Sequence, residues 1–230
     1  VVELWPSVTL MKEGMNALAN HFTTLETVLI NNYSCSSYPV DVLRLCSNLE
    51  TFGDNEVNYP PGFLLRVDAK TFVDYDLDLE SLRPWRCEAS LKTLKVVIDG
   101  IPRPDLIGEG VIEEEYPGQG REIQGRVFDR LARLTNLEYL ILGGGEYKVG
   151  KTECLEMSLE SGLGKLSGLK RLKELDVVGM EAKIGTNEFQ WMMENWPSQC
   201  CIRGLEEDGH TDVGAEELSL SLDIGRRMQF

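Results

Sequence analysis

Apolar residues between Val127 and Val178 change their spacing twice, in the same way each time. A spacing of three, typical of the inner stripe of a helix and the turn after it, gives way to a spacing of two. In a strand that second spacing buries alternate side chains. The first run is Leu131, Leu134, Leu137, Leu140 and Leu142, and the second is Leu163, Leu166, Leu169, Leu172, Leu175 and Val177. The pattern therefore predicts a helix-to-strand unit written twice.

These runs match the leucine-rich-repeat pattern L-x-x-L-x-L. We expect an α/β fold, a leucine-rich-repeat solenoid with a parallel sheet on its concave face and helices on its convex face. It would occupy residues 1–230 as a single irregular domain. The first apolar position of each expected strand is its anchor, and the anchors are Leu25, Leu49, Leu91, Leu137, Leu172 and Ile202.

Successive anchors are separated by 24, 42, 46, 35 and 30 residues, whereas leucine-rich repeats run about 20 to 29 residues. The two longest steps coincide with Gly/Pro-rich stretches, residues 54–62 and 102–125. Insertions there would lie on one face, because a loop inside the stack would bury unpaired backbone groups. The register between residues 55 and 120 stays open: residues 64–86 fit strand or helix, and an anchor at Leu94 fits nearly as well as Leu91.

Other stretches predict further elements. Met11, Met15, Leu18 and Phe22 share one helical face, and a short helix starts at Pro39. A helix through Phe189, Met192, Met193 and Trp196 should end at Pro197, which cannot continue a helix. The alternation of Leu218, Leu220, Leu222 and Ile224 predicts a final strand.

The strand pattern also predicts which side chains reach the concave surface. The anchor, +3 and +5 positions point inward, so the +2 and +4 positions point outward. The candidate partner-binding residues are Thr27, Leu29, Thr93, Lys95, Tyr139, Ile141, Glu174 and Asp176. In this prediction Tyr139 and Ile141 form an apolar patch whose acidic rim is Glu174 and Asp176.

Composition narrows the class of partner. With 23 basic and 38 acidic residues the net charge is −15, which argues against nucleic acid or an anionic membrane as the main partner.

The six cysteines form no C-x-x-C pair, which favours a reducing compartment, cytoplasm or nucleus. No apolar run approaches the length of a membrane helix. Because the chain starts at Val1 without Met, we expect a fragment of a longer protein.

One motif predicts different chemistry. Residues 145–152 match G-x-x-x-x-G-K-[ST], the phosphate-binding P-loop, with Gly145, Gly150, Lys151 and Thr152 as its key residues. Two features argue against a P-loop. Glu146 would place a negative charge within the loop that has to bind phosphate. Leu155, Met157 and Leu159 alternate like a strand where a helix should begin. We therefore interpret this stretch as a glycine-rich loop between repeats and expect no cofactor and no metal.

Three segments, residues 128–137, 160–166 and 191–197, resemble the irregular repeats of fungal F-box leucine-rich-repeat proteins. The resemblance covers residues 120–205 well and the N-terminal half loosely. It implies a curved solenoid that captures a target protein, with an N-terminal F-box that passes the target to a ubiquitin ligase through an adaptor. This chain shows no F-box, so the adaptor is expected as a partner only if an F-box precedes residue 1.

The sequence therefore predicts a non-catalytic protein-binding module, the substrate-recognition repeat region of an F-box-type ubiquitin-ligase receptor. A stand-alone leucine-rich-repeat scaffold without a ubiquitin link is the first alternative. A P-loop nucleotide-binding protein is the second.

Overall fold

The structure, a computed structural model, describes residues 1–4, 12–30, 38–54, 65–75, 83–103, 118–143 and 154–205. The final strand expected over residues 218–224 lies outside these ranges. Within them the fold is α/β and its strands pair in parallel. The predicted α/β class and the parallel pairing of the strands are therefore confirmed.

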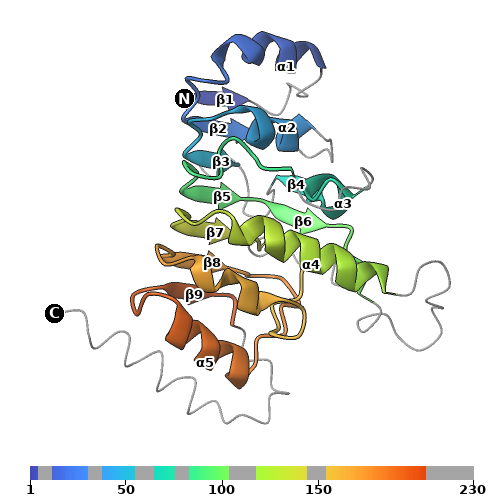
Figure 1. The fold of residues 1–230 in the computed structure, drawn as a ribbon, viewed down its shortest axis with the longest axis vertical. Coiled ribbons are helices and arrows are strands. Elements are labelled where there is room, and N and C mark those ends of the chain that lie inside the picture. The colour runs from blue at the N-terminus through green and yellow to red at the C-terminus, as the bar shows by residue number, and fades with distance from the viewer. Residues whose placement is uncertain are drawn as a thin grey trace.

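The main sheet has seven strands whose spatial order follows the sequence. They are β1 (Val2–Leu4), β2 (Thr27–Ile30), β3 (Thr51–Gly53), β5 (Thr93–Lys95), β7 (Tyr139–Ile141), β8 (Glu174–Asp176) and β9 (Cys201–Arg203). All six pairings between neighbours are parallel. The strands form one column along the long axis of the molecule, each directly below the one before it (Figure 1).

The helices form a second column beside the strands, in the same order (Figure 1). They are α1 (Lys12–Leu18), α2 (Tyr38–Leu45), α3 (Ala69–Phe72), α4 (Gln119–Ala132) and α5 (Thr186–Asn195), with short 3-10 helices η1 (Ala19–His21) and η5 (Leu163–Gly168). α5 ends before Pro197, as predicted. The indole N–H of Trp196 donates to the Leu166 carbonyl at 3.0 Å, which ties the end of α5 to η5.

The core lies between the two columns, and the predicted leucines fill it. Five anchors, Leu25, Leu49, Leu91, Leu137 and Leu172, are buried. The residues three positions later align across the sheet and are completely buried: Val28, Phe52, Leu94, Leu140 and Leu175. Leu91 is therefore the anchor of β5, because Leu94 occupies the inward position within the strand.

Two hydrogen-bond patterns recur from one strand to the next. The Glu26 carbonyl accepts the N–H groups of Glu50 and Thr51, and the corresponding carbonyls of Glu50, Lys92 and Glu138 each accept two N–H groups in the same way. The residue before the anchor also donates its side chain to the previous turn: Asn48 to the Thr23 carbonyl, Ser90 to Ser47 and Asn136 to Ala89. These bonds fix the edge at which the strands begin.

Three sequence expectations were wrong. Ile202 pairs with Leu175, so it occupies the inward position of β9 and the anchor lies three residues earlier, at Gln199. The expected loop over 102–125 ends early, because α4 starts at Gln119 and buries Ile123. Residues 155–157, whose alternation is typical of a strand, belong to neither a strand nor a helix.

The region after β5, where the sequence left the register open, contains a separate strand. β5 ends at Lys95, and β6 (Val97–Asp99) pairs with β4 (Arg66–Asp68) in a second sheet.

The chain after β8 passes so close to Gly143 that no side chain fits there. A Cβ on Gly143 would lie 2.4 Å from both the nitrogen and the oxygen of Val178. Because these are main-chain atoms, relief would require the backbone after β7 or β8 to move. We therefore predict that Gly143→Ala lowers the free energy of unfolding by about 1–3 kcal/mol or more, measured by urea denaturation.

Gly164 provides the matched control. It lies in η5, where an added Cβ would meet nothing within 4 Å. Gly164→Ala should leave stability unchanged or raise it by up to about 1 kcal/mol, because alanine restricts the unfolded chain. Equal losses in the two variants would contradict the close approach at Gly143.

Candidate functional site

The outward face of the main sheet carries two rows of aligned side chains. The register places Thr27, Thr51, Thr93, Tyr139, Glu174 and Cys201 in the first row. In the second row Leu29 aligns with Gly53, and Lys95 aligns with Ile141, Asp176 and Arg203. Because successive side chains of a strand point to opposite faces, both rows lie opposite the buried core positions. We call these two rows the strand face.

Six of the eight predicted face residues are partly exposed: Thr27, Leu29, Thr93, Lys95, Tyr139 and Glu174. The prediction that Ile141 and Asp176 are exposed was wrong, since each keeps only 9% of its accessible surface. Ile141 lies between Lys95 and Asp176 in the same row, and side chains on adjacent strands stand about 5 Å apart. The Asp176 carboxylate accepts the Val178 N–H at 2.9 Å, which holds it against the main chain after β8.

Arg203 belongs to this face and was missed by the sequence argument. Its Nη1 lies 3.4 Å from Glu174 Oε1 and 3.5 Å from Asp176 Oδ2. Asp176 and Glu174 raise the pKa of the Arg203 guanidinium. The expected acidic rim is therefore partly neutralised within the chain, because one guanidinium faces two carboxylates. The alternation of Cys201, Ile202 and Arg203 could have indicated that Arg203 points outward. Because Ile202 was treated as the anchor, the predicted register was shifted and Arg203 was not assigned to the face.

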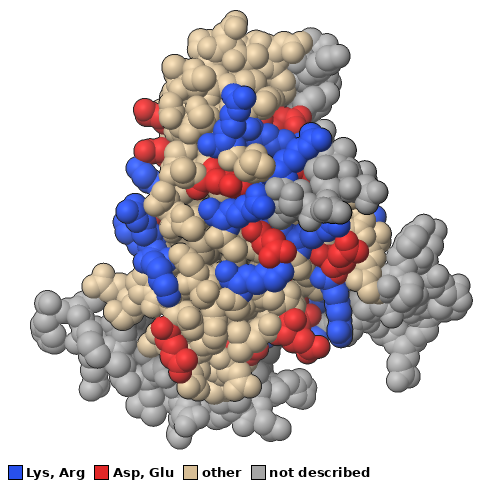
Figure 2. All heavy atoms as spheres, viewed as in Figure 1, with Lys and Arg blue, Asp and Glu red and all other residues tan. Residues whose placement is uncertain are grey.

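A row of charged residues flanks the strand face where the strands begin. Lys92 Nζ lies 2.7 Å from Glu50 Oε1, and Lys173 Nζ lies 2.6 Å from Glu138 Oε2. Figure 2 shows acidic and basic side chains along the left-hand edge, the edge at which Figure 1 places the starts of the strands. Hydrogen bonding to Lys173 lowers the pKa of the Glu138 carboxyl, and Glu138 raises the pKa of Lys173.

Tyr139 is the largest side chain of the first row and lies where the charged row meets the strand face. It aligns with Thr93 on one side and Glu174 on the other. Lys173 Nζ lies 5.7 Å from the centre of its ring, within cation–π range. An aromatic ring held between a cation, a carboxylate and a hydroxyl can contact both apolar and polar groups of another polypeptide.

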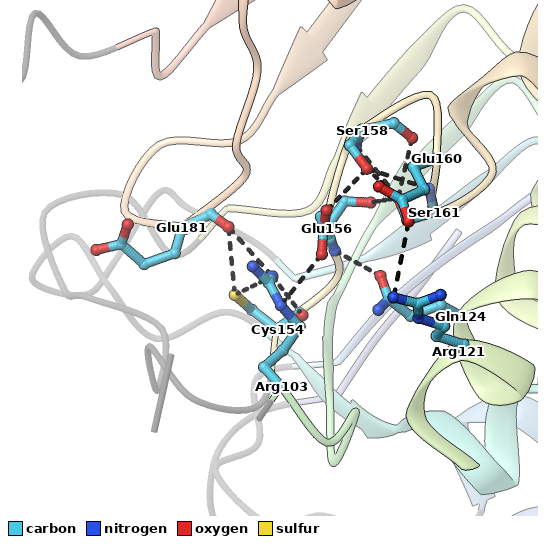
Figure 3. A network of polar contacts seen from close by, with 9 residues as sticks. All are labelled: Arg103, Arg121, Gln124, Cys154, Glu156, Ser158, Glu160, Ser161 and Glu181. Atoms are coloured by element: carbon cyan, nitrogen blue, oxygen red, sulfur yellow. Dashed lines mark hydrogen bonds and ion pairs between the residues drawn. The ribbon is translucent and has the colours of Figure 1, made fainter. Parts of the chain in front are cut away.

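The four P-loop residues, Gly145, Gly150, Lys151 and Thr152, lie outside the described ranges. The residues that follow at 155–157 are not helical, whereas a P-loop opens directly into a helix. Arg103 holds this segment: it donates to the carbonyls of Cys154 and Glu181, both at 3.2 Å, and its Nε lies 3.5 Å from the Glu156 carboxylate. Figure 3 shows the buried guanidinium between these three residues. The segment after the motif is thus anchored by Arg103 without forming a helix.

The described residues offer little for other chemistry. Among them, no group of three or more His, Cys, Asp or Glu side chains is placed to hold a metal ion. No helix in the described ranges has the length and apolar character to cross a membrane.

Comparison with protein-family models, curated proteins and solved structures finds no match for this chain. The resemblance to fungal F-box leucine-rich-repeat proteins therefore stays a prediction that depends on the residues quoted for it.

The pairing of Glu138 with Lys173 gives a pH-dependent prediction. Because the folded-state pKa of Glu138 is lowered, the stabilisation from this pair is present above the unfolded-state pKa. It is lost as the pH falls through the folded-state pKa. We predict that Lys173→Gln raises the pKa of Glu138 toward the ordinary glutamate value, measured by NMR titration of its side-chain carboxyl carbon.

Lys165→Gln is the control for this titration, because Lys165 pairs with Asp129, 2.8 Å away, on the helix side. An unchanged pKa of Glu138 in Lys173→Gln, or an equal shift in Lys165→Gln, would contradict the pairing.

Proposed function

We propose that this chain is a leucine-rich-repeat solenoid that binds a protein partner along its strand face. The proposal of a solenoid is supported by the in-order parallel strands, the aligned inward leucines and the recurring bonds of Asn48, Ser90 and Asn136. Placing the last anchor at Gln199 also makes the final step 27 residues, within the range of about 20 to 29 residues of regular repeats.

The observation that carries the function is the continuity of the first outward row, from Thr27 to Cys201. The six strands that carry this row, at about 4.8 Å spacing, give it a length of roughly 24 Å, about that of a 16-residue helix. The row combines threonines, the Tyr139 ring and Glu174, whose charge is paired with Arg203 of the second row. Such mixed composition around an aromatic residue is typical of protein-binding surfaces.

The role that we assign to this binding is target recognition for a ubiquitin ligase, and it depends on the F-box-type resemblance. In that role the adaptor would contact an F-box outside residues 1–230, and the strand face would hold the target. The protein would act in the cytoplasm or nucleus, without catalysis and without binding nucleic acid or membrane. A scaffold with the same strand face and no ubiquitin link is the competing function.

Substitution of Tyr139 tests the strand face. We predict that Tyr139→Ala weakens binding of the partner by about 2 kcal/mol or more, roughly thirtyfold, because an aromatic residue at the centre of an interface contributes strongly. The measurement is quantitative affinity capture from a cell extract, with the same proteins followed for wild type and variants.

Met193→Ala is the matched control. Met193 is 56% exposed on α5, on the helix side, so its loss removes an apolar side chain of similar length away from the strand face. Proteins lost with Tyr139→Ala and retained with Met193→Ala would support the proposal. Proteins lost with both variants or with neither would contradict it.

The ubiquitin-ligase role has its own test. We predict that the full-length gene product captures an F-box adaptor in a pull-down, whereas residues 1–230 alone do not, because the adaptor contacts the F-box. The absence of adaptor from the full-length pull-down, with target capture intact, would favour the scaffold function.

A further inference from the structure

A buried network of ion pairs connects α2, the segment 83–88 and the end of α4. The guanidinium of Arg130 is completely buried and lies 3.1 Å from Asp74 Oδ2 and 3.6 Å from Glu88 Oε1. Arg44 bonds the other oxygen of Asp74 and also Asp41, the latter at 2.7 Å. Trp85 lies under Arg130, with the guanidinium 4.7 Å from the ring centre.

This network fixes the main chain of residues 83–88. Arg130 donates to the carbonyl of Arg83, the Arg86 N–H donates to the carbonyl of Arg44, and the Trp85 N–H donates to Glu88 at 3.0 Å. Because these contacts use main-chain groups of 83 and 86, the side chains of Arg83 and Arg86 are left on the surface, where both residues are exposed. Neither makes an ion pair with a described residue.

A third exposed arginine adjoins them. Arg133 Nη1 lies 3.7 Å from the same Glu88 oxygen that accepts the Trp85 N–H, and its side chain is 37% exposed. Arg83, Arg86 and Arg133 together form what we call the arginine surface. Figure 2 shows basic side chains, interleaved with acidic ones, over the face on which Figure 1 places α2, α3 and α4.

Among the described residues of the arginine surface and its network, positive charges outnumber negative ones. The arginine surface and the network beneath it contain five arginines against Asp41, Asp74 and Glu88, a net +2, in a chain of net −15. Interactions between exposed charges decay over about 8 Å at physiological salt. A partner that contacts this surface therefore experiences the local positive charge more strongly than the distant acidic residues.

Buried donors beneath the arginine surface are also unsatisfied. Arg44 Nε, Arg130 Nε and Trp85 Nε1 have no hydrogen-bond acceptor, although each atom is inaccessible. Unsatisfied buried donors are uncommon and costly in folded proteins. Because these atoms are inaccessible, a carboxylate of a partner can reach only the exposed arginine side chains around them, which supply the hydrogen-bond donors and the positive charge.

We propose that the arginine surface docks an acidic segment, rich in Asp and Glu, of a partner protein. This binding site is separate from the strand face, because its arginines lie in the segment 83–88 and at the end of α4, outside the strands of the main sheet. Arg83 and Arg86 would hold carboxylates in bidentate pairs, and the buried network would keep their main chain in place before binding. The negative charge of this acidic segment thus distinguishes it from a target bound on the strand face.

The test uses a fluorescent octaglutamate peptide and fluorescence anisotropy with residues 1–230. We expect binding that weakens several-fold between 50 and 200 mM salt and about tenfold in the double variant Arg83→Glu/Arg86→Glu. The double variant Arg83→Lys/Arg86→Lys should retain part of the affinity. Because both positions contribute only main-chain groups to the network, the thermal unfolding midpoint should remain close to that of the wild type.

Arg121→Glu is the matched control. Arg121 is also an exposed arginine of α4, with its side chain 85% accessible, but it lies twelve residues before Arg133, about 18 Å along the helix. Peptide binding should survive this change. An equal loss of peptide affinity in Arg121→Glu and in Arg83→Glu/Arg86→Glu would overturn the proposal, because the peptide would then respond to overall charge and not to the arginine surface.

Two further outcomes would overturn the proposal. The first is tighter binding of an eight-nucleotide oligothymidylate than of octaglutamate, which would make nucleic acid the better occupant. The second is peptide binding that appears only after Asp76, Asp78 and Glu80 are replaced by their amides, which would mean that the chain supplies its own acidic segment.

Discussion

The structure depends on burying the inward apolar side chain of each short strand against those of its neighbours. A strand of three or four residues cannot bury its own apolar face, and neither can the helix that follows it. Stacking solves both problems, because Val28, Phe52, Leu94, Leu140 and Leu175 align across the sheet and are completely buried. The same alignment fixes the outward residues, so the core determines which side chains form the strand face.

The sequence predicted this alignment wherever a leucine marked the strand. Leu137 and Leu172 placed Tyr139 and Glu174 in one outward row, and the structure aligns them directly. Burial of the anchor leucines follows from the same pattern, since a spacing of three and then two leaves these positions on the inner side. The α/β class, the parallel strands and most of the face residues were therefore accessible from leucine spacing alone.

The remainder depends on tertiary contacts that spacing does not encode. Ile202 has the apolar character of an anchor, but pairing with Leu175 places it three positions further along the unit. Val97 and Ile98 continue the apolar run of β5, yet they leave the main sheet to pair with Arg66 and Val67. Ile141 has the alternation of an outward residue, and only its neighbours in the sheet make it buried.

Net charge likewise says little about individual surfaces. A chain of net −15 places Arg203 over its two outward carboxylates, pairs Lys92 with Glu50 and Lys173 with Glu138, and gathers arginines around Asp74. Global charge governs solubility and long-range encounter, whereas the choice of partner depends on charges within a few ångströms of the contact. The strand face is close to neutral and the arginine surface is positive.

The parallel arrangement also separates the strand starts, which repeat the same contacts, from the connections between strands, which differ in length. Strand starts share one edge, where Glu26, Glu50, Lys92 and Glu138 repeat the same carbonyl contacts. Strand ends share the opposite edge, where β2, β3 and β7 end at Ile30, Gly53 and Ile141. Insertions at that edge change neither the register nor the core, because the strands are already fixed at their starts. The unequal steps between anchors are therefore compatible with one regular sheet.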